Sequence, residues 1–417
     1  MKKRLSALLM CVVMVMAMVG CGSGEEEKKT DGTEAPAVKE TKAAETKAPE
    51  TKAEETKAAE TKAASAGKNP NFEYVVEAGT ASDVNDYYAQ YDIECDITIR
   101  QQGGSVNWLG GGDVPLPEPK EKYTIGFAAY TTVDEVGAMY LEGMQAAAKE
   151  IGIELLVNDA NWDQNVQNQA IEQWILQGVD GVILSPCDFY GIKDALDALE
   201  EANIPVVSYD APPNAGNVDA VVMYDAVEQG RLAGEALLKA LQDSNTEMKG
   251  NIYYGTLPFK HPNAQTREYG FFSVFEEYPD VKIEAITGEA PEEFYSGMEG
   301  KIQADPDMLG AWGLFSSATY GMMQAIAASD SGILLSSVDN DRVILEGIYN
   351  GSVLGSTGYS AIEGSRLALM QMVNILNGEE VPGIIYQTNT FVTKDNVETM
   401  FEEYYGGATL ADFIAGN

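Results

Sequence analysis

In the larger, C-terminal part of the chain, short apolar runs alternate with stretches in which apolar residues recur every three or four positions. The run Tyr123–Ala129 is almost wholly apolar, which predicts a strand buried on both faces, as in a parallel sheet. After it, Met139, Gly143 and Ala147 fall on one face of a helix. Gly152 is suited to end that helix, because glycine readily adopts the left-handed conformation found just past helix C termini.

Eight further apolar runs predict strands, and helical patterns fill the gaps between them. The first series comprises Ile153–Val157, Gly181–Leu184, Pro205–Tyr209 and Ala220–Met223, and the second comprises Asn251–Gly255, Val281–Thr287, Gly310–Leu314 and Ile333–Val338. Such alternation predicts parallel sheets with helices on both faces. Two series predict an α/β protein with two lobes, in which a ligand binds beyond the carboxyl ends of the strands.

Residues 70–122 show a different pattern. The segment Ile93–Ile99 alternates apolar and polar residues, which predicts a half-buried strand. Two clusters of glycines interrupt the pattern, and three prolines between positions 115 and 119 form a rigid connector. We interpret residues 70–122 as a small N-terminal β-rich extension that packs on the main body.

The N terminus has the pattern of an export signal. Three basic residues precede the apolar run Leu5–Val19, which is too short to span a membrane comfortably. The run ends in Met18-Val19-Gly20-Cys21, which resembles a bacterial lipobox, in which the Cys becomes diacylated and N-terminal after cleavage. We therefore predict a signal peptide over 1–20 and lipidation of Cys21, which gives stable anchoring by two acyl chains. The alternative is an ordinary signal peptide with an incidental Cys.

Residues 21–69 predict a disordered linker. The sequence Glu-Thr-Lys-Ala recurs there with a period of five residues, and the segment has no aromatic residue. Such a composition cannot bury enough apolar surface to fold. As a flexible coil the linker would span roughly 40 Å, which would hold the folded part away from the membrane.

Charge excludes one class of partner. The chain has 65 acidic and 27 basic residues and a formal net charge of −38. Such a surface repels phosphate backbones, so we expect no nucleic-acid partner.

The residue inventory argues against an enzyme. His261 is the single histidine and is expected to be a plain loop residue. Cys95 and Cys187 remain in the mature chain, where two thiols suit buried small apolar residues better than a disulfide framework. This leaves no nucleophile–base pair and predicts no catalytic residue.

Cofactor motifs are missing as well. The spacing Asp159-x-Asn161-x-Asp163 begins like a calcium loop, but Gln164 and Ala170 stand where that loop needs Gly and Glu. The sequence also has no phosphate-binding Gly-Lys-Ser/Thr loop. We therefore expect no metal and no cofactor.

Several segments in order resemble one family, the periplasmic sugar-binding proteins of the ribose/galactose-binding type, which are type I solute-binding proteins of ABC transporters. The matching segments are Gln177–Pro186, Ala202–Asp210, Gly230–Glu235, Arg267 with Gly270-Phe271, Gly364–Ala368 and Val392–Val397. The resemblance covers residues 123 to 400 and implies two Rossmann-like lobes joined by a hinge. Repressors of the lactose type share this core, but the export signal and linker exclude their DNA-binding N terminus.

The resemblance also implies lobe boundaries. The first lobe would comprise 123–225 and 359–388, and the second 226–358 and 389–417. The chain would cross between them near Asp225, Tyr359 and Asn389.

Three framework residues of the family's ligand site have counterparts here. Asp210 closes a predicted strand, Asp339 follows another, and Arg267 stands at the family's ligand-binding Arg. Sugar hydroxyls both donate and accept, so a site for them pairs carboxylates with donors such as Arg. We expect Arg267 and Asp210 on the cleft wall. The alternatives are a helix cap or hinge hydrogen bond for each Asp and a surface ion pair for Arg267.

Other pocket positions depart from the family. Asp134 stands where the family has Asn, Phe315 and Ser316 replace the usual Asn-Asp, and Tyr359 replaces a Gln near the hinge. Trp162 is a further aromatic candidate at a cleft-facing loop. For the aromatic residues, the alternative is ordinary packing.

The resemblance implies an extracytoplasmic, lipid-anchored, monomeric solute-binding protein. It would capture a small polar ligand, in the first place a sugar, and deliver it to an ABC permease. A ligand-presenting sensor for a chemoreceptor or two-component kinase is the alternative, and a glycosidase-type enzyme is a remote one.

Overall fold

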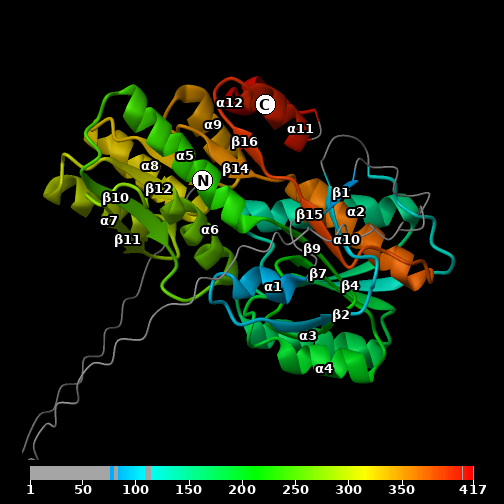
Figure 1. The fold of residues 1–417 in the computed structure, drawn as a ribbon. Coiled ribbons are helices and arrows are strands. Elements are labelled where there is room, and N and C mark those ends of the chain that lie inside the picture. Colours follow the sequence, from blue (N-terminus) through cyan, green and yellow to red (C-terminus); the bar gives the residue numbers. More distant parts are fainter. Residues whose placement is uncertain (1–75, 79–82, 109–113, 406, 417) are drawn as a thin grey trace, which may run out of the picture. The chain divides into compact units, whose positions relative to one another are not determined.

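The computed structural model describes residues 76–78, 83–108, 114–405 and 407–416 (Figure 1). The predicted signal peptide, Cys21 and the linker lie outside these residues. Within the described part, every helix is too short or too polar to cross a membrane.

The first lobe is built on an eight-stranded sheet. All neighbouring strands run parallel except β1, which is antiparallel to β3. The strand order is β1 (Val76–Ala78), β3 (Ser105–Trp108), β15 (Ile384–Gln387), β9 (Ala220–Tyr224), β7 (Val206–Asp210), β6 (Gly181–Leu184), β4 (Thr124–Ala129) and β5 (Glu154–Asp159).

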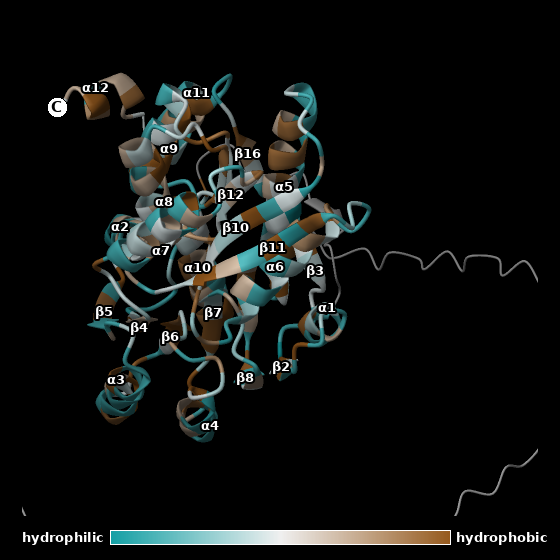
Figure 2. Ribbon diagram, turned by 90° about the vertical axis from the view of Figure 1, so that its left-hand side faces the viewer, coloured by the Kyte–Doolittle hydropathy of each residue, from teal (hydrophilic) through white to brown (hydrophobic). Residues whose placement is uncertain are grey.

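Helices cover both faces of this sheet, because successive residues of each strand point to opposite sides. Ile125 and Phe127 of β4 share a cluster with α2 (Glu135–Ile151) and α10 (Ala361–Leu376). Ala128 belongs to the opposite cluster, with α3 (Gln164–Gln177) and α4 (Lys193–Glu201). In Figure 2, the outer helix α3 is largely polar whereas β7 is apolar.

The second lobe contains a six-stranded sheet that is parallel except for its last strand. Its order is β11 (Val281–Thr287), β10 (Gly250–Thr256), β12 (Gly310–Gly313), β13 (Leu335–Val338), β14 (Ser356–Gly358) and β16 (Thr390–Val392). One face packs on α5 (Ala226–Asp243) and α6 (Pro262–Ser273). The other packs on α7 (Pro291–Ala304), α8 (Ser316–Ser329), α9 (Arg342–Asn350) and α11 (Val397–Tyr404), and the short α12 (Leu410–Ile414) follows α11.

The chain passes between the two sheets three times. It leaves β9 and enters α5 at Asp225, returns from β14 to α10 through Tyr359, and leaves β15 for β16 through Asn389. Two α/β lobes with parallel sheets confirm the predicted fold class. The predicted end of the helix after β4 is also confirmed, since Gly152 has a φ of 75° and its N–H bonds to the carbonyl of Ala148.

The N-terminal extension is more deeply integrated than the sequence pattern indicates. Its strands β1 and β3 enlarge the main sheet of the first lobe instead of forming a separate element. Its strand β2 (Asp96–Ile99) pairs in parallel with β8 (Ala215–Val218), and its helix α1 (Val84–Ala89) packs against the first lobe. The extension thus packs on the main body as predicted, and the sequence pattern did not indicate that its strands would continue the sheet of the first lobe.

The two described cysteines are free and lie apart. The Cys95 thiol donates to the carbonyl of Pro213 and the Cys187 thiol to that of Tyr130, each over 3.7 Å. Burial raises the pKa of both thiols to about 12, so both are protonated at neutral pH.

Candidate ligand-binding site

Two aspartates mark the carboxyl edges of the two sheets. Asp210 ends β7 in the first lobe, and Asp339 directly follows β13 in the second. Their φ angles are 79° and 75°, in the left-handed region that few residues other than glycine adopt. Strained backbone of this kind clusters at functional sites, so its presence at both positions points to this edge.

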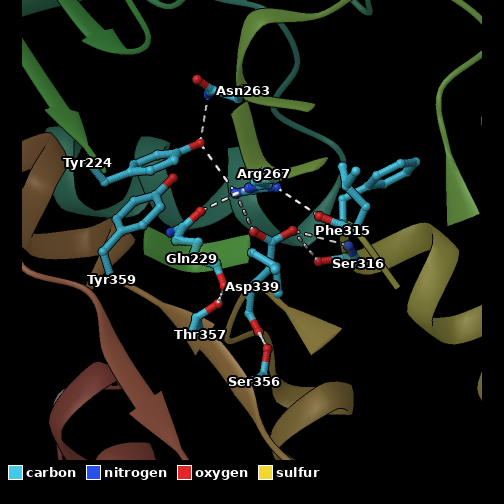
Figure 3. Close-up of polar contacts among 12 residues, drawn as sticks. Tyr224, Gln229, Asn263, Arg267, Phe315, Ser316, Asp339, Ser356, Thr357 and Tyr359 are labelled. Atoms are coloured by element: carbon cyan, nitrogen blue, oxygen red, sulfur yellow. Dashed lines mark hydrogen bonds and ion pairs between the residues drawn. The ribbon is translucent and has the colours of Figure 1, made fainter. Parts of the chain in front are cut away.

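Arg267 of α6 is the centre of the polar network in the second lobe (Figure 3). Its Nε donates to Oε1 of Gln229 over 2.9 Å, and its Nη1 donates to the carbonyl of Leu314 over 3.0 Å. Its Nη2 lies 3.1 Å from Oδ1 of Asp339 and 3.4 Å from the hydroxyl of Tyr224. Four N–H groups of a guanidinium that has five are thus engaged by the protein itself. With 6% of its surface exposed, Arg267 is a buried residue.

The second oxygen of Asp339 is engaged by Ser316. The backbone N–H and the hydroxyl of Ser316 lie 3.1 and 3.2 Å from Oδ2 of Asp339. The same hydroxyl lies 2.5 Å from Oδ2 of Asp341, whose other oxygen caps α9. Burial, and then the nearby carboxylate of Glu135, raise the pKa of Asp341 to about 7. Two carboxylates therefore converge on one serine.

The first-lobe carboxylate, Asp210, is bound by tyrosines. Its Oδ1 accepts from the hydroxyl of Tyr140 over 2.9 Å and from that of Tyr359 over 3.1 Å, and the two hydroxyls also contact each other. Burial raises the pKa of Asp210. The ring of Tyr359 stacks on Tyr224 at 4.3 Å, and Tyr224 in turn contacts Arg267. A continuous set of contacts thus connects the carboxylates of the two lobes through the hinge.

Asp134 and Trp162 form a second group around Tyr130. Oδ1 of Asp134 accepts from the N–H of Gly137, which caps α2, and lies 3.5 Å from the hydroxyl of Tyr130. Burial raises the pKa of Asp134 to about 6, and the carboxylate of Asp339 raises it too. The ring of Trp162, 52% exposed, lies 4.5 Å from that of Tyr130. Asp134 therefore caps α2, a role that the sequence analysis did not assign to it.

Phe315 does not join the network. Its backbone precedes α8, but its ring packs edge-to-face on Phe294 of α7 at 5.5 Å and points away from Arg267 (Figure 3). The ring of Phe315 therefore packs in the way that the alternative for the aromatic residues describes.

The two lobes touch across the cleft. Glu135 of α2 forms an ion pair with Arg342 of α9 over 3.3 Å and accepts the backbone N–H of Arg342 over 3.1 Å. Phe189 of the first lobe packs edge-to-face on His261 of the second at 4.6 Å. Burial, and then the nearby charge of Arg267, lower the pKa of His261 to about 3. His261 is thus a neutral cleft contact, which differs from the plain loop residue expected from the sequence.

A small cavity lies between the lobes, beside the hinge. A cavity of about 10 Å³ lies beside Tyr359, which is room for about one water molecule. It is lined by Val136, Met139, Asp339, Asn340, Asp341, Gly358, Tyr359 and Ala361. A larger cavity, of about 240 Å³, lies under α8 and the start of β13 and includes none of the predicted site residues. A drug-sized ligand fills several hundred Å³, which is more than this cavity between the lobes holds.

Sequence reasoning missed two tyrosines of the network. Tyr224 is the last residue of β9, so its place at a strand's carboxyl end is a signal that could have found it. Tyr140 lies in the first half of α2, and only the packing of that helix brings its hydroxyl to Asp210. Among the described residues, His, Cys, Asp and Glu side chains form no group of three that could hold a metal ion.

Comparison with known proteins adds a family match. Residues 125–380 match the family model described as periplasmic binding protein domain. The ribose import binding protein RbsB of Bacillus subtilis (strain 168) is 25% identical over 269 residues, which cover 63% of this chain and 84% of that protein. The xylitol-binding protein of Mycolicibacterium smegmatis is 26% identical over 269 residues, covering 63% and 74%.

Solved structures show the same fold. A periplasmic solute-binding protein of an ABC transporter from Actinobacillus succinogenes, with bound D-allose, has a TM-score of 0.62 at 21% identity and covers 67% of this chain and 100% of that one. The binding protein of the arabinose ABC transporter from Shewanella sp. ANA-3, bound to L-arabinofuranose, has a TM-score of 0.60 at 26% identity and covers 68% and 96%. The described parts of the extension, residues 76–78, 83–108 and 114–122, precede the family match.

Proposed function

This chain belongs to the periplasmic binding protein family, and we propose that it captures a small neutral polyhydroxy solute, a sugar or a polyol, outside the cytoplasm for an ABC importer. The observation that carries the proposal is the set of contacts from Asp210 through the hinge tyrosines to Arg267 and Asp339. It lies at the carboxyl edges of both sheets, where open α/β sheets bind their ligands. Relatives that bind ribose and xylitol support this solute class.

The polar groups of the cleft suit hydroxyls. Asp210 accepts hydrogen bonds from two tyrosine hydroxyls, Tyr140 and Tyr359. A solute hydroxyl that replaces a tyrosine hydroxyl at this carboxylate keeps the number of hydrogen bonds constant, so the exchange leaves no buried acceptor unpaired. The stacked rings of Tyr224 and Tyr359 offer an apolar surface next to these groups, which suits the C–H side of a sugar.

The charges of the cleft disfavour anions. The cleft region holds four carboxylates, those of Asp134, Asp210, Asp339 and Asp341. The polar network contains one arginine, Arg267, and nearly all of its donors are already engaged by the protein. A carboxylate or phosphate on the solute would meet buried negative charge without a free donor, which is costly. We infer that sugar acids and sugar phosphates are excluded.

Capture is coupled to lobe movement by the position of the tyrosines. Tyr224 and Tyr359 adjoin two of the crossings between the sheets, so a solute that contacts them acts on the hinge directly. A solute that also bonds to groups of both lobes binds the closed arrangement better than the open one and shifts the population towards it. The ion pair between Glu135 and Arg342 contributes to closure independently of the solute.

Delivery and anchoring complete the proposal. Lipidation of Cys21 would hold the protein at the membrane, and the segment 21–69 would act as the tether. Family membership supports a binding protein and not an enzyme. Import is the first assignment, because relatives such as RbsB are import binding proteins, and presentation to a sensor kinase is the second candidate.

A solute panel tests the proposal. The full-length protein is screened by thermal shift against pentoses, hexoses and polyols, with sugar acids and sugar phosphates as expected non-binders. A solute at about 100 times its dissociation constant should stabilise the fold by about 2.7 kcal/mol. Calorimetry on the identified solute should then show weaker binding to Asp210→Asn by at least about tenfold, a loss of about 1.4 kcal/mol.

The matched control is Asp305→Asn. Asp305 accepts hydrogen bonds from Asn251 and Tyr253 at the opposite, amino-terminal end of β10, so this change should leave affinity intact. A panel in which only acids or phosphates stabilise the protein would contradict the assigned solute class. Consumption of the solute on incubation would contradict a binding role.

A further inference from the structure

The N-terminal extension is anchored in the first lobe. Val84, Tyr87 and Tyr88 of α1 are each at most 2% exposed. They share one apolar cluster with Val221 of β9 and Tyr386 of β15. Helix α1 therefore moves with the first lobe.

From this anchor, Tyr87 reaches the hinge. Its hydroxyl donates to Oδ1 of Asp225 over 2.9 Å and accepts the N–H of Val227 over 3.4 Å. Asp225 is the first crossing point and also caps α5 of the second lobe. Its carbonyl accepts from Asn389, which lies at the third crossing. Tyr87 of the extension is thus bonded to Asp225, the residue at which the first crossing contacts the third.

Tyr91 reaches the second lobe itself. Its ring lies 4.7 Å from that of Tyr269, at an angle of 59°. Tyr269 belongs to α6, the helix that also carries Arg267. In Figure 1, α1 lies next to α6, in agreement with this contact. The extension therefore bridges the two lobes on the hinge side of the molecule.

The strand that follows holds the segment after Asp210. The thiol of Cys95 donates to the carbonyl of Pro213, and the N–H of Asp96 donates to the carbonyl of Asn214 over 2.6 Å. Strand β2 then pairs with β8 directly beyond that segment. The extension thus contacts the hinge, the second lobe and the segment 211–214 that follows Asp210.

We propose that residues 83–99 act as a brace that holds the lobes together and sets the balance between open and closed arrangements. Tyr87 and Tyr91 are its positioning residues, and they act through Asp225 and Tyr269. A contact that the open arrangement loses stabilises closure by its own free energy, and the apparent affinity for any solute that needs closure rises by the same factor. The brace lies outside the family match, so it is a feature of this chain beyond the common core.

Hydrogen exchange of the full-length protein without added solute tests the brace. The backbone N–H of Arg342 is the reporter, because it bonds to Glu135 across the cleft and, at the first position of α9, has no partner within the helix. Tyr91→Ala should accelerate exchange at Arg342 by about two- to tenfold, the range expected for an aromatic pair. Tyr91→Phe keeps the ring and should exchange like the wild type.

Tyr87 has a matched control on its own helix. Tyr87→Phe removes the hydroxyl that bonds to Asp225 and Val227 and should accelerate exchange at Arg342. Tyr88 is equally buried, but its hydroxyl has no hydrogen-bond partner in the described structure, so Tyr88→Phe should have no effect.

Two results would overturn the brace. The first is wild-type exchange at Arg342 in both Tyr91→Ala and Tyr87→Phe. The second is an equal acceleration at Ile252, a buried core position of β10, since the variants would then weaken folding as a whole and not closure. Neither measurement uses a solute, so a failed brace is distinguishable from a failed solute assignment.

Discussion

At the scale of single residues, Arg267 is bonded mainly to the protein itself. A cleft-wall arginine that binds solute directly would keep its donors free, but this guanidinium is 6% exposed and bonds to Gln229, Leu314, Tyr224 and Asp339. We propose that it positions the groups that face the solute.

Replacing Arg267 should lower the stability of the fold more directly than the affinity for the solute. Arg267→Ala leaves Asp339 partly buried without its cation, so the free energy of unfolding should fall by about 3–5 kcal/mol. Urea titration measures the loss. Arg231→Ala is the control, because its ion pairs with Glu228 and Glu235 are exposed and such pairs contribute less than about 1 kcal/mol. A wild-type midpoint for Arg267→Ala would show that the buried pair does not stabilise the fold.

Asp134 should make stability depend on pH. Its pKa is raised from an ordinary 3.8 to about 6, so between these values the folded state binds more protons than the unfolded state. The stability that this group contributes is present below about pH 4 and is lost as the pH rises through 6. Asp134→Asn, which stays neutral, should therefore lose about 1–3 kcal/mol less than the wild type between pH 4 and 7. Urea titrations at several pH values check this, and equal slopes for both proteins would contradict it.

At the scale of elements, the position of Arg267 depends on how closely α5 and α6 approach. A Cβ on Gly230 of α5 would lie 1.8 Å from the carbonyl oxygen of Arg267, and a Cβ on Gly270 of α6 would lie 1.9 Å from that of Val227. Only residues without side chains permit this separation. The two helices thus place Arg267 beside Gln229 because each carries a glycine at the contact.

A pair of glycine substitutions tests this packing. Gly230→Ala should force the helices apart and lower the free energy of unfolding by about 1–3 kcal/mol or more. Gly300→Ala is the control: Gly300 lies in α7, a Cβ there would meet nothing within 4 Å, and alanine should stabilise the helix by up to about 1 kcal/mol. Thermal unfolding measures both. Equal melting temperatures for the two variants would show that α5 and α6 can separate at no cost.

At the scale of the whole chain, the described fold is one part of a protein whose N terminus predicts membrane attachment. The sequence places Cys21 directly after the apolar run Leu5–Val19, and the repetitive segment 21–69 separates it from the fold. A tethered binding protein stays near a membrane importer without contacting it permanently, which raises its effective concentration there.

Cys21→Ser tests the anchor. Without the thiol no acyl chains can be attached, so the variant should appear in the soluble fraction or remain as uncleaved precursor. Fractionation of cells followed by immunoblotting separates these forms, and Cys187→Ser, a buried position in the fold, controls for general effects of losing a cysteine. Unchanged membrane retention of correctly trimmed Cys21→Ser protein would exclude a lipid anchor at this residue.

Local patterns were enough to predict most strands of the two parallel sheets. The run Gly181–Leu184 became a strand with those same bounds and is buried at every position, as expected inside a parallel sheet. Val281–Thr287 also became a strand with the predicted bounds, but it is the edge strand β11, where polar residues such as Lys282 and Glu284 are exposed. Asp210 and Asp339 were named because the family resemblance implies ligand contacts there, and each lies at the carboxyl end of a strand, one in each sheet.

The partners of these residues were decided by the tertiary structure alone. Nothing near Ser105–Trp108 in the sequence indicates pairing with Ile384–Gln387, and nothing in α2 indicates that Tyr140 bonds to Asp210. Periodicity indicates which face of an element is buried. It does not indicate the partner, because any apolar face of the right size could cover that face. The choice of partner depends on how all elements pack together, and the tyrosine network and the brace arise from that choice.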